Sequence, residues 1–182
     1  MRNKILTLVF AIATVSAAAV VQYELASRNI DKDYSLKFST RSTDGTFSGL
    51  KGTVNFDPSR LESALIDISV DASSIQTGNK KKDQHANSAD WLDTEKYPEI
   101  LFTSSSFKKK NDKIIVEGNL TLHGVTKKAL IPFVYSDADG TFNGSFVINR
   151  SDYGVTGVGM KAKFVGEEIE ITFNIPTSLK TG

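Results

Sequence analysis

The stretch Glu168–Ile175, E-I-E-I-T-F-N-I, decides how this chain folds. Its apolar residues are Ile169, Ile171, Phe173 and Ile175, and one polar residue separates each from the next. Because successive side chains of a β-strand point to opposite faces, this period of two gives the strand one apolar and one polar face. The apolar face needs a partner surface, so the chain is expected to build its core from sheet faces.

The same alternation recurs along most of the chain. It is seen in the runs 34–38, 54–56, 66–70, 100–102, 114–122, 130–135 and 142–148. Turn signals such as Asp57-Pro58, Asn111-Asp112 and Gly166-Glu167 separate several of these runs. We count about eight to ten strands, which predicts an all-β antiparallel sandwich or barrel. Closing the sheet removes its edges, so a barrel of about eight strands is expected.

One long segment, Ser73–Ser104, interrupts this repetitive pattern. It holds the sole tryptophan, Trp91, and ends near the Tyr97-Pro98 pair. We predict a short helical insertion between strands here, a turn or two over 88–91 with Ser88 as its N-cap. Insertions of this kind often cover, gate or line a binding site.

Composition narrows the class of protein. At 182 residues the chain is expected to be a single domain that is large enough to bury a core. It has no cysteine, which excludes disulfides, a thiolate nucleophile and a cysteine metal site. Sheet and core must therefore supply the stability.

The first 19 residues have the pattern of a secretory signal. Arg2 and Lys4 precede the apolar run Ile5–Val15, and the small residues Ser16–Ala19 follow it. Cleavage near Ala19 would leave residues 20–182 as a periplasmic or secreted domain, and an uncleaved membrane anchor is the alternative. The mature chain would have 20 basic residues against 21 acidic ones, and this balance argues against a nucleic-acid partner.

Six motifs carry a resemblance to a known family. They are G-T-F-S-G-L-K-G-T-V-N-F-D-P (Gly45–Pro58), S-I-Q-T-G-N (Ser74–Asn79), D-Q-H-A-N-S-A-D-W-L-D (Asp83–Asp93), K-Y-P-E-I-L-F-T-S (Lys96–Ser104), G-N-L-T-L-H-G-V-T-K (Gly118–Lys127) and N-R-S-D-Y-G-V (Asn149–Val155). In this order they resemble the bacterial YceI family of exported lipid-binding proteins, across essentially the whole mature chain. Two positions depart from the family pattern, because Lys82 stands where Arg is common and Ala86 where Leu is common.

The resemblance implies a lipocalin-like extended antiparallel β-barrel around an apolar pore. The implied partner is a long-chain lipid or amphiphile, such as an isoprenoid, quinone-like or fatty-acyl molecule, and no other cofactor is implied. Transient contact with a membrane surface, for which the lysine runs 80–82 and 108–110 are candidates, and a homodimer are left open. More often, lysine runs are solvated faces of loops.

The apolar faces of the strands supply the candidate lumen residues. These are Phe38, Phe56, Ile66, Ile68, Val70, Phe102, Leu120, Leu122, Phe133, Phe146, Ile148, Ile171 and Phe173. They would line a tunnel that keeps water away from the lipid chain, which contributes ~0.8 kcal/mol per buried CH₂. The alternative is a filled barrel in which these side chains contact only one another, as in a stress-response or protein-interaction module without a small ligand.

A second set is polar or aromatic and is expected at the rim, near a ligand headgroup. It comprises Asp83, His85, Trp91, His123, Arg150, Asp152 and Tyr153. A guanidinium would suit a phosphate headgroup, but hydrogen bonds that hold loops to the rim are the simpler role. Trp91 is either a lid residue or an anchor for the insertion.

Catalysis and metal binding have little support in the sequence. Neither histidine has a nucleophile nearby in the sequence, and there is no G-x-S-x-G motif. A zinc site built from Asp83, His85 and His123 lacks local ligand spacing. The prediction is therefore a non-enzymatic protein without a metal, and a hydrolase or isomerase acting on the bound lipid is the third hypothesis.

Overall fold

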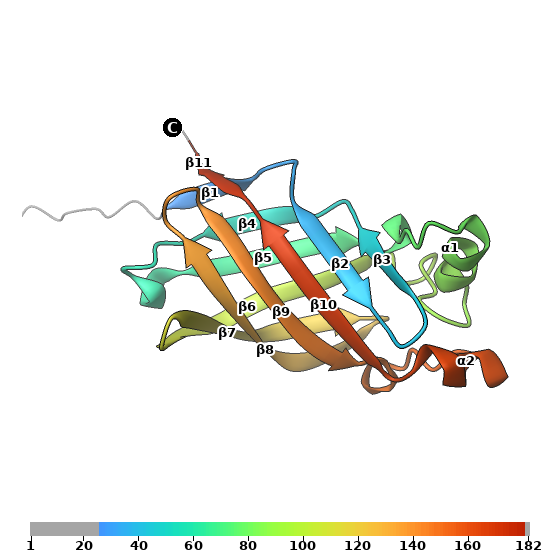
Figure 1. Cartoon of the computed structure of the whole chain (residues 1–182). Coiled ribbons are helices and arrows are strands. Elements are labelled where there is room, and N and C mark those ends of the chain that lie inside the picture. The colour runs from blue at the N-terminus through green and yellow to red at the C-terminus, as the bar shows by residue number, and fades with distance from the viewer. Residues whose placement is uncertain (1–25, 181–182) are drawn as a thin grey trace, which may run out of the picture.

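The computed structural model describes residues 26–180, in which eleven strands form one curled antiparallel sheet with two short helices at one end (Figure 1). The strands are β1 (Ser27–Ile30), β2 (Ser35–Ser39), β3 (Asp44–Phe47), β4 (Lys51–Asn55), β5 (Leu65–Asp71), β6 (Glu99–Lys110), β7 (Lys113–Leu122), β8 (Val125–Ser136), β9 (Thr141–Asn149), β10 (Glu168–Ile175) and β11 (Thr177–Leu179). The helices are α1 (Lys80–Asn87) and α2 (Met160–Val165), and the 3₁₀ turns are η1 (Leu61–Ser63), η2 (Ala72–Ser74) and η3 (Arg150–Tyr153).

The predicted all-β antiparallel architecture is confirmed. The predicted signal segment, residues 1–19, and the alternative N-terminal anchor lie outside the described residues. Within residues 26–180, neither helix is long and apolar enough to cross a bilayer.

The strand order explains how the sheet curls back on itself. The order is β11-β1-β4-β5-β6-β7-β8-β9-β10-β2-β3. Only Pro176 separates β10 from β11, and β11 pairs with β1, so at this residue the chain passes from one side of the strand order to the other and the sheet curls back on itself. Proline has no N–H for the ladder, which accounts for the break. Its carbonyl accepts from the N–H of Asp31 at 3.0 Å, in the matching break between β1 and β2.

These two breaks explain why the structure has more strands than the eight to ten expected. The first strand and the last strand are each divided into two short pieces. The pieces of the first strand pair with the pieces of the last one: β2 pairs with β10, and β1 pairs with β11. The alternation in the sequence identified only the longer pieces, β2 and β10, and it missed the short strands β1 and β11.

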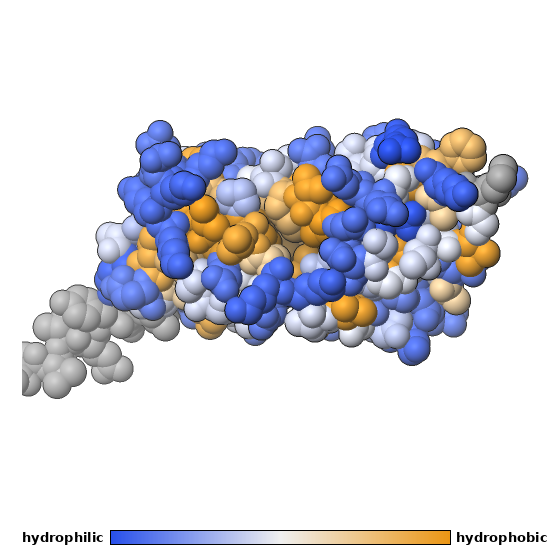
Figure 2. Space-filling view, turned by 90° about the horizontal axis from the view of Figure 1, so that it is seen from below, coloured by the Kyte–Doolittle hydropathy of each residue, from blue (hydrophilic) through white to orange (hydrophobic). Residues whose placement is uncertain are grey.

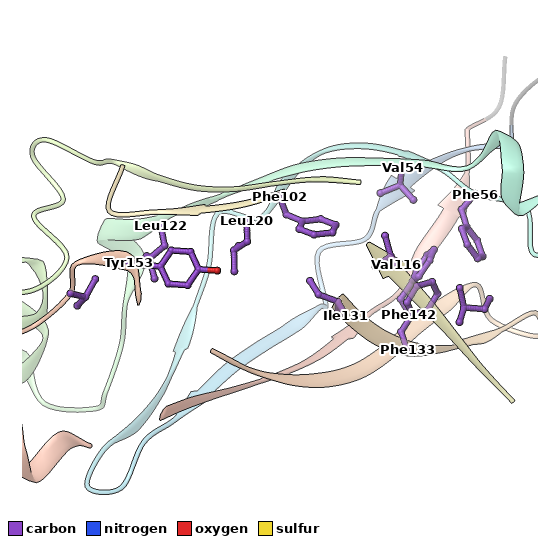
Figure 3. Close-up of a cluster of buried hydrophobic side chains, with 12 residues drawn as sticks. Val54, Phe56, Phe102, Val116, Leu120, Leu122, Ile131, Phe133, Phe142 and Tyr153 are labelled. Carbon is purple, nitrogen blue, oxygen red and sulfur yellow. The ribbon is translucent and has the colours of Figure 1, made fainter. Parts of the chain in front are cut away.

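Aromatic rings fill the core at the end of the sheet away from the helices, and Leu120, Leu122 and Tyr153 continue the core toward the helices (Figure 3). Phe56 is at the centre, with 1% of its surface exposed. The centroid of its ring lies 4.9 Å from those of Tyr135 and Phe142 and 5.7 Å from that of Phe133. Such tilted and edge-on pairs stabilise by about 0.5–1.5 kcal/mol each beyond the burial of area.

The helix of the insertion begins eight residues earlier than predicted. The N-cap is Asn79, whose side-chain oxygen accepts from the N–H groups of Lys81 and Lys82 at 3.0 and 3.2 Å. The predicted N-cap, Ser88, is wrong, because it lies at the C-terminal end of α1. The sequence of α1 is K-K-K-D-Q-H-A-N, which has no apolar stripe, so periodicity gave no signal for it.

Asp57 ends β4 and holds the following turn. Its carboxylate accepts from the N–H and hydroxyl of Ser59 at 2.9 and 2.6 Å and from Nε of Arg60 at 2.8 Å. The Ser59 hydroxyl, followed by Arg60 and the Ser59 N–H, lowers the pKa of Asp57 to about 2.

Asp57→Asn is expected to lower the free energy of unfolding by about 1–2 kcal/mol at neutral pH. The folded-state pKa is depressed, so the carboxylate stabilises fully above its ordinary pKa and loses its effect as the pH falls toward about 2. Urea denaturation of both proteins between pH 2 and pH 6, about the range of titration, measures this difference. Asp33→Asn, at an exposed position, is the control. A difference that does not shrink in acid would contradict the assigned role of the carboxylate.

Candidate functional site

A cavity of about 570 Å³ runs inside the curled sheet, from the aromatic cluster to the two helices. Strands from both walls line it, together with His85 and Ala86 of α1 and Phe164 and Val165 of α2. The lining is almost entirely apolar, because each strand turns its apolar face inward.

The cavity explains why many inward-facing side chains are only half-buried. Ile169, Ile171, Phe173 and Ile175 belong to the face of β10 that lines it, and all four are of intermediate exposure. Side chains in a filled core would be closed off by their neighbours, as Phe56 is. The interior therefore has a filled end and a hollow remainder.

Every residue of the predicted lumen set except Phe56 lines the cavity. Phe56 is instead fully surrounded by aromatic rings. Alternation in the sequence says which face a side chain occupies but not how far along the barrel it lies. Whether the lining residues bind a lipid stays a prediction.

Several lining residues were absent from the predicted set. Leu36, Ile169 and Ile175 share strand faces with residues that were included, so the alternation was sufficient to find them. Phe164 and Val165 had no such signal, because α2 lies between Gly159 and Gly166 where a hairpin turn was expected. Both of these glycines have positive φ, 75° and 82°, which marks the chain reversals on either side of α2.

The helix α1 is fastened across one end of the cavity. Nε1 of Trp91 donates to Nε2 of His85 at 2.9 Å, and the two rings meet edge to face. Nζ of Lys82 donates to the hydroxyl of Thr43, in the loop before β3, at 3.3 Å. Lys82, His85 and Trp91 all line the cavity, as does Ala86. The two departures from the family pattern, Lys82 and Ala86, thus both lie at the cavity wall.

Arg150 organises the wall beside α2. Its Nε donates to the carbonyl of Gly166 at 2.6 Å, and Nη2 donates to that of Ala162 at 3.0 Å. Nη1 donates to the carbonyls of Val155 and Thr156 at 2.5 and 2.7 Å. The residue is 5% exposed, and its guanidinium lies 5.2 Å from the centroid of the Trp91 ring.

These four carbonyls occupy most of the guanidinium donors, and all four come from the segment 155–166, which contains α2. Arg150 lines the cavity, but its geometry is that of a loop organiser. The sequence analysis gave hydrogen bonds that hold loops as the simpler role for Arg150, but it could not name the partners, because the acceptors are main-chain atoms.

The remaining rim candidates hold loops in place. Asp83 accepts from the N–H and the hydroxyl of Thr77 at 2.8 and 2.7 Å, and the hydroxyl and then the N–H lower its pKa. Nδ1 of His123 lies 3.3 Å from the carbonyl of Tyr153, and its ring packs edge-on against Tyr97. None of Asp83, His123 and Tyr153 lines the cavity.

Tyr153 and Asp152 lie next to each other in η3 and differ sharply in exposure. Tyr153 is 4% exposed, and its burial raises the pKa of the hydroxyl, with a smaller effect from Asp152. Asp152 is exposed and pairs with Nζ of Lys127 at 3.3 Å. In the part of the chain that the structure describes, no three His, Asp or Glu side chains gather as they would around a metal ion.

The comparisons with known proteins agree on one family. A sequence model of the YceI-like domain matches residues 14–177. Protein YceI of Escherichia coli O157:H7 is 35% identical over 135 residues, which cover 70% of this chain and 69% of that protein.

Solved structures share the fold. The crystal structure of BcnA from Burkholderia cenocepacia has a TM-score of 0.77 at 24% identity, covering 82% of this chain and 99% of BcnA. A structure described as a polyisoprenoid binding domain from Saccharophagus degradans has a TM-score of 0.63 at 15% identity, covering 86% of this chain and all of that domain.

Proposed function

The chain belongs to the YceI-like family, and from this premise and the cavity we propose that it is an exported protein that binds a polyisoprenoid or another long-chain amphiphile. It would sequester or carry this molecule in the periplasm or outside the cell. The signal-like pattern of residues 1–19 supports export.

The observation that carries this proposal is the apolar cavity. Its volume of about 570 Å³ lies within the range of small-molecule sites, about 300–1,000 Å³. A wall of Ile, Leu, Val and Phe side chains selects a ligand by its length and apolar character. It offers few groups that could take part in a reaction. A chain that enters it gains ~0.8 kcal/mol for each CH₂ removed from water.

The same observation weighs against the filled barrel as a description of the whole interior. Rings fill only one end, and side chains along β10 face open space. The structural likeness to a domain described as polyisoprenoid binding adds support from a protein of the same fold.

Lipid binding is tested directly by analysing what the purified protein carries. We expect organic extraction and mass spectrometry to recover a long-chain lipid from protein purified under native conditions. For delipidated protein, we expect the fluorescence of Trp91, the sole tryptophan, to change on titration with fatty acids because its ring lines the cavity.

Affinity in this titration should rise roughly tenfold for every two CH₂ groups until the cavity is full. Trp91→Phe is the control, since it removes the optical signal while calorimetry still detects binding. Protein that is empty after purification and binds no fatty acid or prenyl alcohol would refute the proposed function.

A further inference from the structure

The sheet is split along one side of the cavity, between β8 and β9. These strands pair through only four residue pairs, from Phe133↔Gly144 to Ser136↔Thr141. Beyond these four pairs, residues 125–132 of β8 pair with β7 alone, and residues 145–149 of β9 pair with β10 alone. We call the gap between these two unpaired edges the side window.

Pro132 explains where the pairing stops. Phe133 is the last residue of β8 that pairs with β9, and Pro132 is the adjacent residue on the unpaired side. A Cβ on Gly144 would lie 2.5 Å from the carbonyl oxygen of Pro132, so this carbonyl is directed toward β9. In an antiparallel ladder the N–H and C=O of one residue face the same neighbour, and proline has no N–H to donate. The ladder thus lacks its next donor on the β9 side.

The window opens onto the cavity. Ile131 of β8 and Phe146 and Ile148 of β9 line the cavity from the two edges. At its other end, the window is closed by the ion pair of Lys127 with Asp152 of η3. The window is therefore bounded by the four-pair ladder at one end and by this ion pair at the other.

The outside of the window carries two exposed apolar side chains. Leu130 of β8 is 64% exposed and Val147 of β9 is 58% exposed, although most outward residues of neighbouring strands are polar. Figure 2 looks onto the β8 side of the molecule and shows a hollow in the middle of this face, bordered by hydrophobic surface. Apolar side chains thus lie on both sides of the sheet at this gap, with Ile131, Phe146 and Ile148 facing the cavity and Leu130 and Val147 facing the outside.

The cavity is also too small for a long chain. An apolar cavity of about 150 Å³ holds one benzene, so about 570 Å³ holds roughly four such groups, or about two dozen carbons. A longer polyisoprenoid must leave part of its chain outside.

We propose that the side window between β8 and β9 is where the end of a long chain leaves the cavity, in contact with Leu130 and Val147. This inference rests on the proposed function and specifies the path of the ligand. A chain that fits inside the cavity does not reach the window surface, and a longer chain does.

The absence of cysteine from the sequence makes the path measurable. We would attach bimane to single cysteines at Leu130→Cys and Val147→Cys in the window, at Val158→Cys before α2, and at Leu179→Cys on β11. All four positions are at least 58% exposed, so labelling leaves the core intact. The probes are a polyprenol of about forty carbons and a fatty acid of about twelve, each with a nitroxide quencher on its terminal carbon.

The expected result is quenching several-fold stronger at residues 130 and 147 than at 158 and 179, with the long probe only. Quenching by the long probe at residue 158 alone would place the end of the lipid chain at the helices and would contradict the proposed exit through the side window. Equal quenching at all four labels would overturn it as well. If Trp91 fluorescence and native mass spectrometry detect no binding of either probe, the proposed function fails, and this inference fails with it.

Discussion

Arg150→Met is expected to lower the free energy of unfolding by about 3–5 kcal/mol, because it leaves four main-chain carbonyls without their donor. The substitution keeps the apolar stem beside Trp91 and removes the donors to Gly166, Val155, Thr156 and Ala162. Buried carbonyls without a donor cost about 1–3 kcal/mol each unless water reaches them. Urea denaturation followed by circular dichroism measures the change.

Two further variants show what the network requires. Arg41→Met removes an exposed arginine and is expected to change stability by less than about 0.5 kcal/mol. Arg150→Lys keeps the charge but cannot span carbonyls on several sides, so most of the loss should remain. Full stability in Arg150→Lys would show that charge alone matters and would contradict the geometric argument.

Ile171→Trp is expected to weaken binding of a long-chain fatty acid by at least about tenfold, since the larger ring occupies volume that about two CH₂ groups would fill. Ile171 lies on β10, lines the cavity and is only half-buried, so there is space for the ring. The stability should change little, whereas the same change in a packed core costs about 1–3 kcal/mol. Calorimetric titration measures binding without the optical signal of the new tryptophan.

The adjacent residue supplies a matched control. Thr172 is exposed on the other face of β10, so Thr172→Trp adds the same ring outside the cavity and should leave affinity unchanged. If both variants bind as the parent does, the ligand does not occupy the part of the cavity beside Ile171. Equal loss in both would point to a general effect of the substitution on β10.

The alternation in the sequence was enough to predict the architecture and twelve of the residues that line the cavity. In β10, residues 169, 171, 173 and 175 share one face in the sequence and one wall in the structure. The rule depends only on local backbone geometry, so it holds wherever a strand is regular. Phe56 obeys the same rule and still misses the cavity, because its position along the barrel axis depends on strand register.

The features that escaped prediction either lack a periodic signal in the sequence or depend on contacts with main-chain atoms of another segment. The helix α1 has no apolar stripe to reveal it, and α2 is a short helix between two glycines. The Arg150 network uses carbonyls up to 16 residues away. Pro132 was visible in the sequence, but its effect requires knowing which neighbour its missing N–H would face.

The pairing of β1 with β11 also determines when the sheet can close during synthesis of the chain. Arg28 near the start of the described residues pairs with Leu179, so the sheet cannot close until residues 177–179 have been synthesised. Contacts so distant in sequence form slowly, because the chain must first lose the entropy of a long loop. A protein exported as we propose would thus stay open for as long as β11 is missing, so its fold itself would delay closure until this segment has left the ribosome.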